Sequence, residues 1–405
     1  MGDYLALMMF PALLLALFLG FPVAFSMMGV ALFFGLVTFD TAVIFQFVQK
    51  VDAMASNFVL AAVPLFIFMG SMLERSGIAG KLFEAVHLWT RRLPGGLAVG
   101  TIVMCVIFAA STGVIGATET VVGLLAIPVM LKYAYDKGLI SGTICAGGSL
   151  GTIIPPSVVV VVLGPVADVS VGDLFVGMMF PGLIMATLYI AYILIRCTID
   201  PKAGPVLPKS DDEPSLIEKV RITLIALAPP VAMIVAVLGS IMFGFAAPTE
   251  AAALGAFGSI LLAVIYKQFS FSILHEAVLK TLKVTCMIML ILLGGNMFAG
   301  VFVASGGVAL AEDLIKAADL ASWATLSVFL LICFVAGFIL DWISVLLIFI
   351  PVFIPIVKSM GFDPVWFCVL FLVVIQTSYL TPPMAPAIFY LRGISPPEIT
   401  LRHMF

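Results

Sequence analysis

The chain has 405 residues, of which 63% are hydrophobic and only 10% are charged, and its mean hydropathy is +1.26. This composition excludes a soluble globular domain and indicates a helical protein that crosses a membrane many times. The net charge of −3 says little about partners. We expect a lipid bilayer around the chain and no nucleic-acid partner, and the placement of Lys and Arg between spans to indicate orientation.

Two apolar runs at the start of the chain predict two membrane spans, at residues 4–19 and from the following turn to about residue 39. The first run has no basic region before it and no cleavage site, so we expect a retained span and not a signal peptide. An amphipathic stretch leads into a third span that ends near Leu73. A segment with a Trp and several basic residues follows, a composition typical of the headgroup region.

Residues 95–131 form an apolar segment that is too long for one span. A straight helix of that length would measure about 50 Å, whereas the hydrocarbon core of a bilayer is about 30 Å thick. Ser111, Thr112 and Gly113 interrupt the segment, and basic residues flank both of its ends. Because basic residues mark the cytoplasmic side, both ends are expected there, and the segment is predicted to be a re-entrant hairpin that turns near Gly113.

The next apolar segment contains a sequence that is unsuited to a continuous helix, GGSLGTIIPPS at residues 147–157. Pro155 and Pro156 lack backbone donors and disfavour helix on their N-terminal side, so carbonyl groups of the preceding turn lose their partners. In hydrocarbon such a break survives only where protein buries it or where it lines a wet cavity or an ion site. A second break of this kind, QTSYLTPPMAP, occupies residues 376–386.

The two breaks belong to an internal repeat whose copies are offset by 227 residues (355 − 128 = 227). Charged loops place the copies in opposite orientations: the first begins outside the cell, and the second begins inside, near Lys283, with a hairpin at residues 324–357 that opens outward. Inverted repeats with paired broken helices are typical of secondary transporters. The matching pairs are Pro128 with Pro355, Asp136 with Asp363, Pro155 with Pro382, Pro156 with Pro383 and, at an offset of 229, Ser76-Gly77 with Ser305-Gly306.

The sequence contains no nucleotide-binding loop, zinc-protease motif or nucleophile elbow, so we expect neither an enzyme nor a cofactor, and an ion gradient as the driving force. Na⁺ prefers oxygen ligands, which freed carbonyls and Ser or Thr hydroxyls supply. We therefore predict two Na⁺ sites and no other metal, although such small residues could instead serve only close helix packing. The first site comprises Ser111, Thr112, Gly113, Gly148, Ser149 and Gly151, and the second comprises Gly337, Asp341, Thr377, Ser378 and Thr381.

Two acidic residues lie within apolar segments, where an ionisable group is costly unless it has a function. Asp341 would ligate or neutralise the cation, whereas Glu119 would either bind substrate or cap nearby backbone. Thr152 and Ser157 complete the candidate substrate-binding set with Glu119. No Arg lies within an apolar segment, so hydroxyls, backbone amides and half-helix N-termini are expected to bind a small carboxylate, with 2-oxo acids included.

The chain resembles the large membrane subunit of tripartite ATP-independent periplasmic (TRAP) transporters over nearly its whole length. The motifs that carry this resemblance, in order, are LGFPVAFSM, GATETVVGLLAIPVMLKYAYDKGL, GGSLGTIIPPS, APTEAAALGAF and LTPPMAP. The resemblance implies an all-α, inverted-repeat, elevator-type fold with two re-entrant hairpins and two broken helices. It also implies Na⁺-coupled uptake of organic acids delivered by a periplasmic binding protein, and a small four-helix membrane subunit as partner, in the bacterial inner membrane.

We divide the chain into N-terminal scaffold spans (1–56), a first repeat (57–196), a cytoplasmic linker (197–221), central scaffold spans (222–283) and a second repeat (284–405). The N-terminus is expected to be periplasmic. The second repeat stops where the first continues into a closing span, so its last helix is expected to be missing, as in a truncated chain. Two alternatives remain open, a stand-alone carboxylate symporter of similar architecture and an ion channel.

Overall fold

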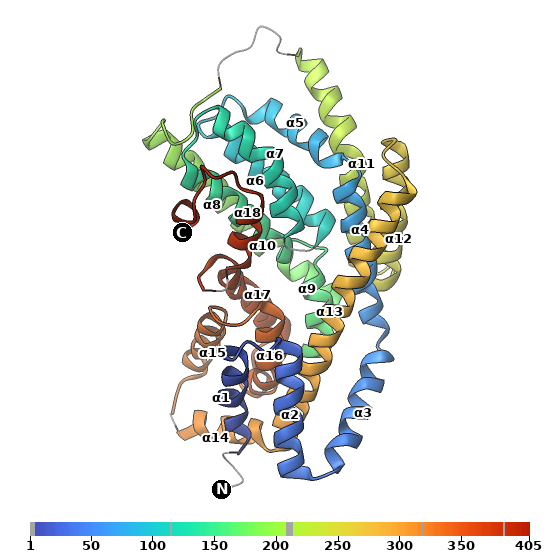
Figure 1. Ribbon diagram of the computed structural model, residues 1–405, viewed down its shortest axis with the longest axis vertical. Coiled ribbons are helices and arrows are strands. Elements are labelled where there is room, and N and C mark those ends of the chain that lie inside the picture. The colour runs from blue at the N-terminus through green and yellow to red at the C-terminus, as the bar shows by residue number, and fades with distance from the viewer. Residues whose placement is uncertain (1–4, 114–115, 208–213, 318, 384) are drawn as a thin grey trace.

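The computed structural model describes residues 5–113, 116–207, 214–317, 319–383 and 385–405 (Figure 1). Within these residues every regular element is a helix, which confirms the expected all-α polytopic fold. Six of the described helices are long and apolar enough to cross a membrane. In the view of Figure 1 the first hairpin and the C-terminus lie in the upper half of the elongated molecule, and the second hairpin and the N-terminus lie in the lower half.

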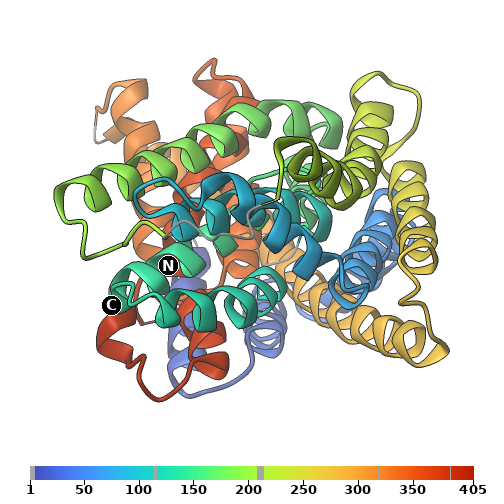
Figure 2. The ribbon, with the colours of Figure 1, turned by 90° about the horizontal axis from the view of Figure 1, so that it is seen from above.

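Long helices form a framework along one side of the molecule. Its elements are α1 (Leu5–Phe18), α2 (Val23–Phe39), α3 (Ala42–Ala55), η1 (Phe58–Ala61), α4 (Ala62–Arg75), α11 (Leu216–Met242), α12 (Pro248–Ile265) and α13 (Phe271–Ala304). Helix α4 packs on α12 and α13, and α13 also packs on α2 and α16 (Trp342–Ser359). Figure 2 shows α4, α11, α12 and the start of α13 gathered on one side.

Helix α13 is longer than the sequence suggested. It runs for 34 residues without an internal proline, and it crosses position 284, where we expected the second repeat to begin. Because α13 is continuous at residue 284, its charged N-terminal half and its apolar C-terminal half form one straight run of helix past the centre of the molecule (Figure 1). The charged residues of the N-terminal half of α13 are therefore held next to the helices that pack on α13.

The first repeat folds into a hairpin and a broken helix. Its elements are α5 (Ile78–Thr90), α6 (Gly96–Thr112), α7 (Ala117–Lys132), α8 (Lys137–Ser149), η2 (Leu150–Thr152), α9 (Val158–Ala167) and α10 (Val171–Ile199). Helix α6 ends at Gly113, whose φ of +59° is a conformation that glycine adopts without strain. Helices α6 and α7 pack against each other, as the predicted turn near Gly113 requires. Residues 153–157, the first break, separate η2 from α9.

The second repeat has the same plan in the opposite direction (Figure 1). Its elements are α14 (Gly307–Ala317), α15 (Ser322–Ala336), α16, α17 (Pro364–Leu380), α18 (Pro386–Ile394) and α19 (Leu401–Met404). Helices α15 and α16 form the hairpin, and residues 381–385, the second break, separate α17 from α18. Both Pro-Pro pairs, at 155–156 and 382–383, are joined by a cis peptide bond.

Corresponding residues of the two repeats make corresponding contacts. Asp136 accepts a hydrogen bond from the backbone N–H of Leu139 at the start of α8 (2.9 Å). Asp363, 227 residues later, accepts one from Trp366 at the start of α17 (2.7 Å). An acidic N-cap satisfies a free N–H group and offsets the positive end of the helix dipole. The repeat is therefore visible in local hydrogen bonding as well as in the order of helices.

The opposite orientation of the repeats predicts opposite labelling of two matched positions. Lys132 and Ser359 are exposed residues at the ends of α7 and α16, and they are 227 residues apart. We expect Lys132→Cys and Ser359→Cys, each in a chain whose exposed Cys286 is replaced by Ser, to react with a membrane-impermeant thiol reagent from opposite sides of the membrane. Labelling of both positions from the same side in right-side-out and inverted vesicles would contradict the inverted repeat.

Candidate functional site

A central cavity of 630 Å³ lies where the two hairpins, the two breaks and the framework meet. This is the size of a small-molecule site. The hairpins contribute Gly113, Gly116, Thr120, Asp341, Trp342 and Ile343. The broken helices contribute Thr152, Val158, Val159, Tyr379, Pro386 and Tyr390. Helices α2, α4 and α13 close the remaining wall with Pro22, Val23, Ala24, Phe25, Glu74, Lys280, Val284, Met287, Ile288, Leu290 and Ile291.

Hydroxyl groups pair the backbone carbonyls around the first break. Ser149 donates to the carbonyl of Ala146 (2.9 Å), and Thr152 donates to that of Ser149 (2.8 Å). Ser157 donates to the carbonyl of Thr152 (2.8 Å). All three hydroxyl-bearing side chains are fully buried. The break is therefore stabilised from within, because each hydroxyl supplies a hydrogen to a carbonyl near the end of the helix.

The tip of the first hairpin contacts the first break directly. The backbone N–H of Val158 donates to the carbonyl of Gly113 (3.2 Å). A Cβ atom on Gly113 would lie 2.7 Å from the carbonyl oxygen of Pro156, so only glycine fits there. Ser111 is buried in the same tip and donates to the carbonyl of Ile107 (2.8 Å). The side chain of Thr112, which we also assigned to this site, lies outside the described residues.

Glu119 lies between the hairpin tip and α8. Its Oε2 accepts a hydrogen bond from the backbone N–H of Gly116 (2.5 Å), so it caps the N-terminus of α7. Its side chain is fully buried against Gly148, and a Cβ atom on Gly148 would overlap the carboxyl group. Its Oε1 has no hydrogen-bond partner among the described residues. Glu119 does not line the cavity. Of the two roles that the sequence left open for it, substrate binding and capping of nearby backbone, the structure shows the cap.

The second hairpin tip meets the end of α17 in a similar way. Asp341 caps α16 by accepting from the backbone N–H of Ile343 (3.2 Å) and from the hydroxyl of Ser344. A Cβ atom on Gly337 would lie 2.8 Å from the Cβ of Ser378, so this tip and α17 are in close contact. The hydroxyls of α17 donate to its own carbonyls, Thr377 to Val374 (2.7 Å), Ser378 to Ile375 (2.7 Å) and Thr381 to Thr377.

A side-chain hydrogen bond joins the two halves at the centre. Gln376 of α17 donates from Nε2 to the hydroxyl oxygen of Thr152 in η2, and both side chains are buried. Thr152 therefore links the first break to the second broken helix while it also holds the carbonyl of Ser149. Gln376 was not predicted as a site residue, because its position in the sequence does not reveal which helix it faces.

The cavity wall contains only some of the residues that the sequence predicted. Gly113, Thr152 and Asp341 line it. The wall does not include Gly148, Ser149, Gly151, Gly337, Thr377, Ser378, Thr381, Ser157 or Glu119, which belong to the broken helices and hairpins. Sequence reasoning missed Tyr379, Tyr390, Thr120 and Lys280, which do line it. Tyr379 and Tyr390 flank the second break in the sequence, and this proximity is the signal that could have identified them.

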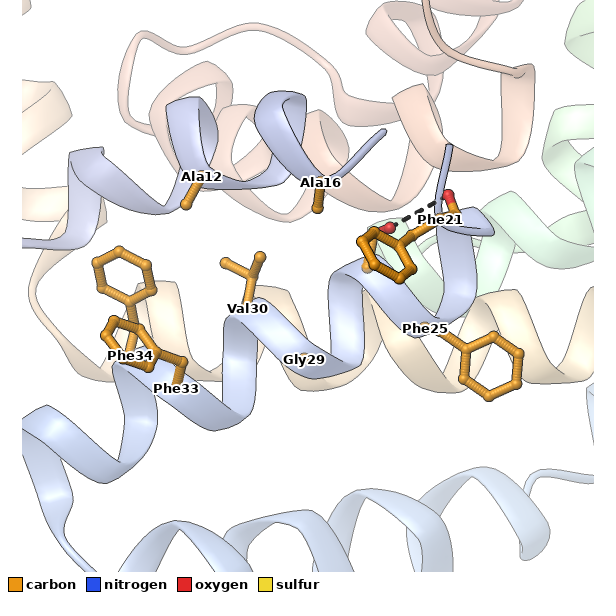
Figure 3. Close-up of a pocket in the computed structure, with 9 residues that line it drawn as sticks. Ala12, Ala16, Phe21, Phe25, Gly29, Val30, Phe33 and Phe34 are labelled. Carbon is orange, nitrogen blue, oxygen red and sulfur yellow. Dashed lines mark hydrogen bonds between the residues drawn. The ribbon is translucent and has the colours of Figure 1, made fainter. Parts of the chain in front are cut away.

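A second hollow is unsuited to an ion or a charged ligand. It has a volume of 350 Å³ and lies between α1 and α2, where Ala12, Ala16, Phe21 and Phe25 are among its lining residues (Figure 3). Its one hydroxyl, on Ser26, donates to backbone carbonyls of the turn before α2, with the bond to Phe21 at 3.3 Å. Polar and charged lining groups are therefore a feature of the central cavity and not of this groove.

The fold and the central cavity define a class of protein, a polytopic membrane protein whose two inverted halves bring their breaks to one central site, as in secondary transporters. The chain belongs to the DctM component family of tripartite ATP-independent periplasmic transporters, whose family model matches residues 10–404. This finding confirms the resemblance seen in the sequence motifs.

Named relatives agree with this membership. The C4-dicarboxylate TRAP transporter large permease protein DctM of Pseudomonas aeruginosa is 29% identical over 85% of this chain and 80% of its own length. The sialic acid TRAP transporter large permease protein SiaM of Vibrio cholerae is 30% identical over 93% of this chain and 87% of its own length. The solved structure of the Alcanivorax borkumensis YdaH transporter matches with a TM-score of 0.62 and 16% identity, over 89% of this chain and 83% of that one. That likeness shows the fold alone.

The bond between Thr152 and Gln376 predicts a measurable coupling between the halves. Thr152→Val removes the buried hydrogen bonds of the Thr152 hydroxyl with the Ser149 carbonyl and the Gln376 amide, so we expect a loss of about 1–3 kcal/mol in the free energy of unfolding. In a double-mutant cycle with Gln376→Leu, measured by chemical unfolding in detergent, the two losses should not add. The control is Thr143→Val in α8, because that buried hydroxyl has no partner among the described residues. Strictly additive losses would contradict the coupling.

Proposed function

We propose that the chain is the large permease subunit of a Na⁺-coupled secondary transporter that imports small organic acids delivered by a periplasmic binding protein. The observation that carries this proposal is the central cavity, where both hairpin tips and both broken helices converge. The family membership supports a tripartite assembly, with a small four-helix membrane subunit as the third component. The bacterial inner membrane is the proposed location, with a periplasmic N-terminus.

The proposed cation sites adjoin the cavity, one in each half, and Gly113 and Asp341 are their members in the cavity wall. In the first, Ser111, Thr112, Gly113, Gly148, Ser149 and Gly151 surround the hairpin tip and the end of α8. In the second, Gly337, Asp341, Thr377, Ser378 and Thr381 surround the other tip and the end of α17. The hydroxyls of Ser149 and Thr381 each direct their hydrogen to a carbonyl, so their oxygen lone pairs remain available to a hard cation.

The cavity wall supports an anionic substrate. The first residues of three helices line it, Val158 of α9, Trp342 of α16 and Pro386 of α18. Helix N-termini carry a partial positive charge, so their convergence favours a carboxylate. The two relatives are named as transporters of carboxylic acids, C4-dicarboxylates in one case and sialic acid in the other. We therefore extend the proposal to small carboxylates, with 2-oxo acids among them.

The position of the cavity between the hairpins and the framework supports movement of an elevator type. One wall belongs to α2, α4 and α13, and the other belongs to the hairpins and broken helices. If the hairpins and broken helices move together against the framework, the cavity is carried between the two membrane faces while the Thr152–Gln376 bond keeps the two halves together. The substrate then crosses with the elements that bind it.

Uptake into proteoliposomes tests the proposed function. The large subunit, co-purified with its small membrane subunit, is supplied with its binding protein and with [¹⁴C]succinate or [¹⁴C]pyruvate. We expect accumulation only with an inward Na⁺ gradient, because cation binding completes the site. Uptake that is indifferent to Na⁺ would remove the coupling, and uptake without the binding protein would favour a stand-alone symporter. A single-channel current would indicate a channel.

Removal of single hydroxyls tests the cation sites. Ser149→Ala and Thr381→Val each delete one proposed Na⁺ ligand, so the Na⁺ concentration for half-maximal uptake should rise about tenfold, equivalent to about 1.4 kcal/mol of binding free energy. Ser259→Ala is the matched control, because Ser259 is a buried serine in α12 that makes the same kind of bond to the carbonyl of Ala256 (2.7 Å). An unchanged Na⁺ requirement in both site variants would refute the assignment.

A further inference from the structure

We propose that Lys280 of α13 is the cationic anchor for the substrate carboxylate, and that the substrate takes the place of Glu74 as the partner of this lysine. This inference rests on the proposed function, because it specifies how an organic acid is held in the central cavity. It assigns a specificity-determining role to a residue of the framework, outside the hairpins and the broken helices.

Lys280 is the one cationic side chain among the described residues that line the cavity. It pairs with the carboxylate of Glu74, which also lines the cavity. The side chains are 33% and 17% exposed, so the pair is partly buried and still accessible from the cavity. Next to it the wall is apolar, with Val284, Met287 and Ile288 following on α13.

The surroundings explain why Lys280 is paired. An ammonium group facing an apolar wall is stable only if an anion or water compensates for its lost hydration. Glu74 supplies that anion. A substrate carboxylate has the same charge and the same acceptor oxygens, so exchange of one for the other keeps the lysine paired. The long, flexible stem of lysine allows its ammonium group to follow the new partner.

The rest of the cavity complements this anchor. The helix N-termini at Val158, Trp342 and Pro386 lie on the walls made by the broken helices and the second hairpin, whereas Lys280 lies on the framework wall. An acid in the cavity is thus held between a lysine and converging helix N-termini. A neutral molecule of the same size would leave Lys280 with Glu74 and gain nothing from the lysine. Lys280 therefore distinguishes anionic from neutral substrates.

A neighbouring ion pair on the same two helices provides a matched control. Arg75 follows Glu74 on α4, and Glu276 precedes Lys280 by one turn on α13. Arg75 and Glu276 pair with each other, with side chains 31% and 51% exposed, and neither lines the cavity. The two pairs have the same chemistry and join the same helices, and they differ in their access to the cavity.

The test is the kinetics of [¹⁴C]succinate and [¹⁴C]pyruvate uptake by the reconstituted tripartite complex. Lys280→Gln should raise KM for the transported acid by at least about tenfold, with a smaller change in kcat, and Lys280→Arg should keep KM within about threefold. The double variant Lys280→Gln with Glu74→Gln should also show the raised KM, although it leaves no unpaired charge. Glu74→Gln alone should lower KM, because Lys280 is then free for the substrate.

The outcomes separate this inference from the proposed function. If the native complex transports an acid and the Lys280→Gln, Glu74→Gln double variant keeps the native KM, Lys280 is not the anchor and the proposed function stands. If Arg75→Gln with Glu276→Gln raises KM equally, the effect comes from helix contact and the inference is overturned. If the native complex takes up neither acid, both fail. A raised KM in the Lys280 variants with an unchanged KM in the control pair supports the inference.

Discussion

The structure depends on how unwound backbone is stabilised in apolar surroundings. Two helices are interrupted by Pro-Pro pairs, of which the first, Pro155-Pro156, is buried, and each interruption leaves polar backbone groups without helical partners. Thr152 shows the solution most clearly. Its hydroxyl donates to the Ser149 carbonyl and accepts from Gln376, and its own carbonyl accepts from Ser157. Thr152 thus serves three purposes: it pairs polar backbone groups at the break, joins the two halves and contributes to the cavity wall.

This solution also explains why the functional groups gather at the centre. A break creates a new helix N-terminus as well as free carbonyls, and α9 and α18 both begin at the cavity. The positive end of a helix favours an anion, whereas freed carbonyls favour a cation. Two breaks facing each other therefore place both chemistries within one small region. The hairpin tips add to it, since Asp341 caps α16 and lines the cavity together with Trp342.

The sequence was sufficient for the plan of the fold but not for the faces of its helices. The spacing of Pro residues predicted the repeat. The hairpin turn at Gly113 was predictable because glycine and small polar residues interrupt an apolar run that is too long for one span. Lys280 was not predicted as a site residue, because it precedes the expected start of the second repeat at residue 284. The structure shows one continuous α13 across that point. Which side of a helix faces a cavity depends on the helices that pack against it, and their positions cannot be read from the sequence. Gln376 and Tyr379 were missed for this reason.

The arrangement of charge suggests how cation and substrate depend on each other. The charged residues of the described cavity wall are Glu74, Asp341 and Lys280, so the wall carries one more negative charge than positive. A carboxylate that enters adds further negative charge, which a cation at Asp341 would offset. If the proposed cation binds at Asp341, the substrate would be held best when the cation is present, and the cation would be held best when the substrate carboxylate also faces it. Two ligands that each lower the free-energy cost of binding the other are coupled through charge alone, without an additional conformational change.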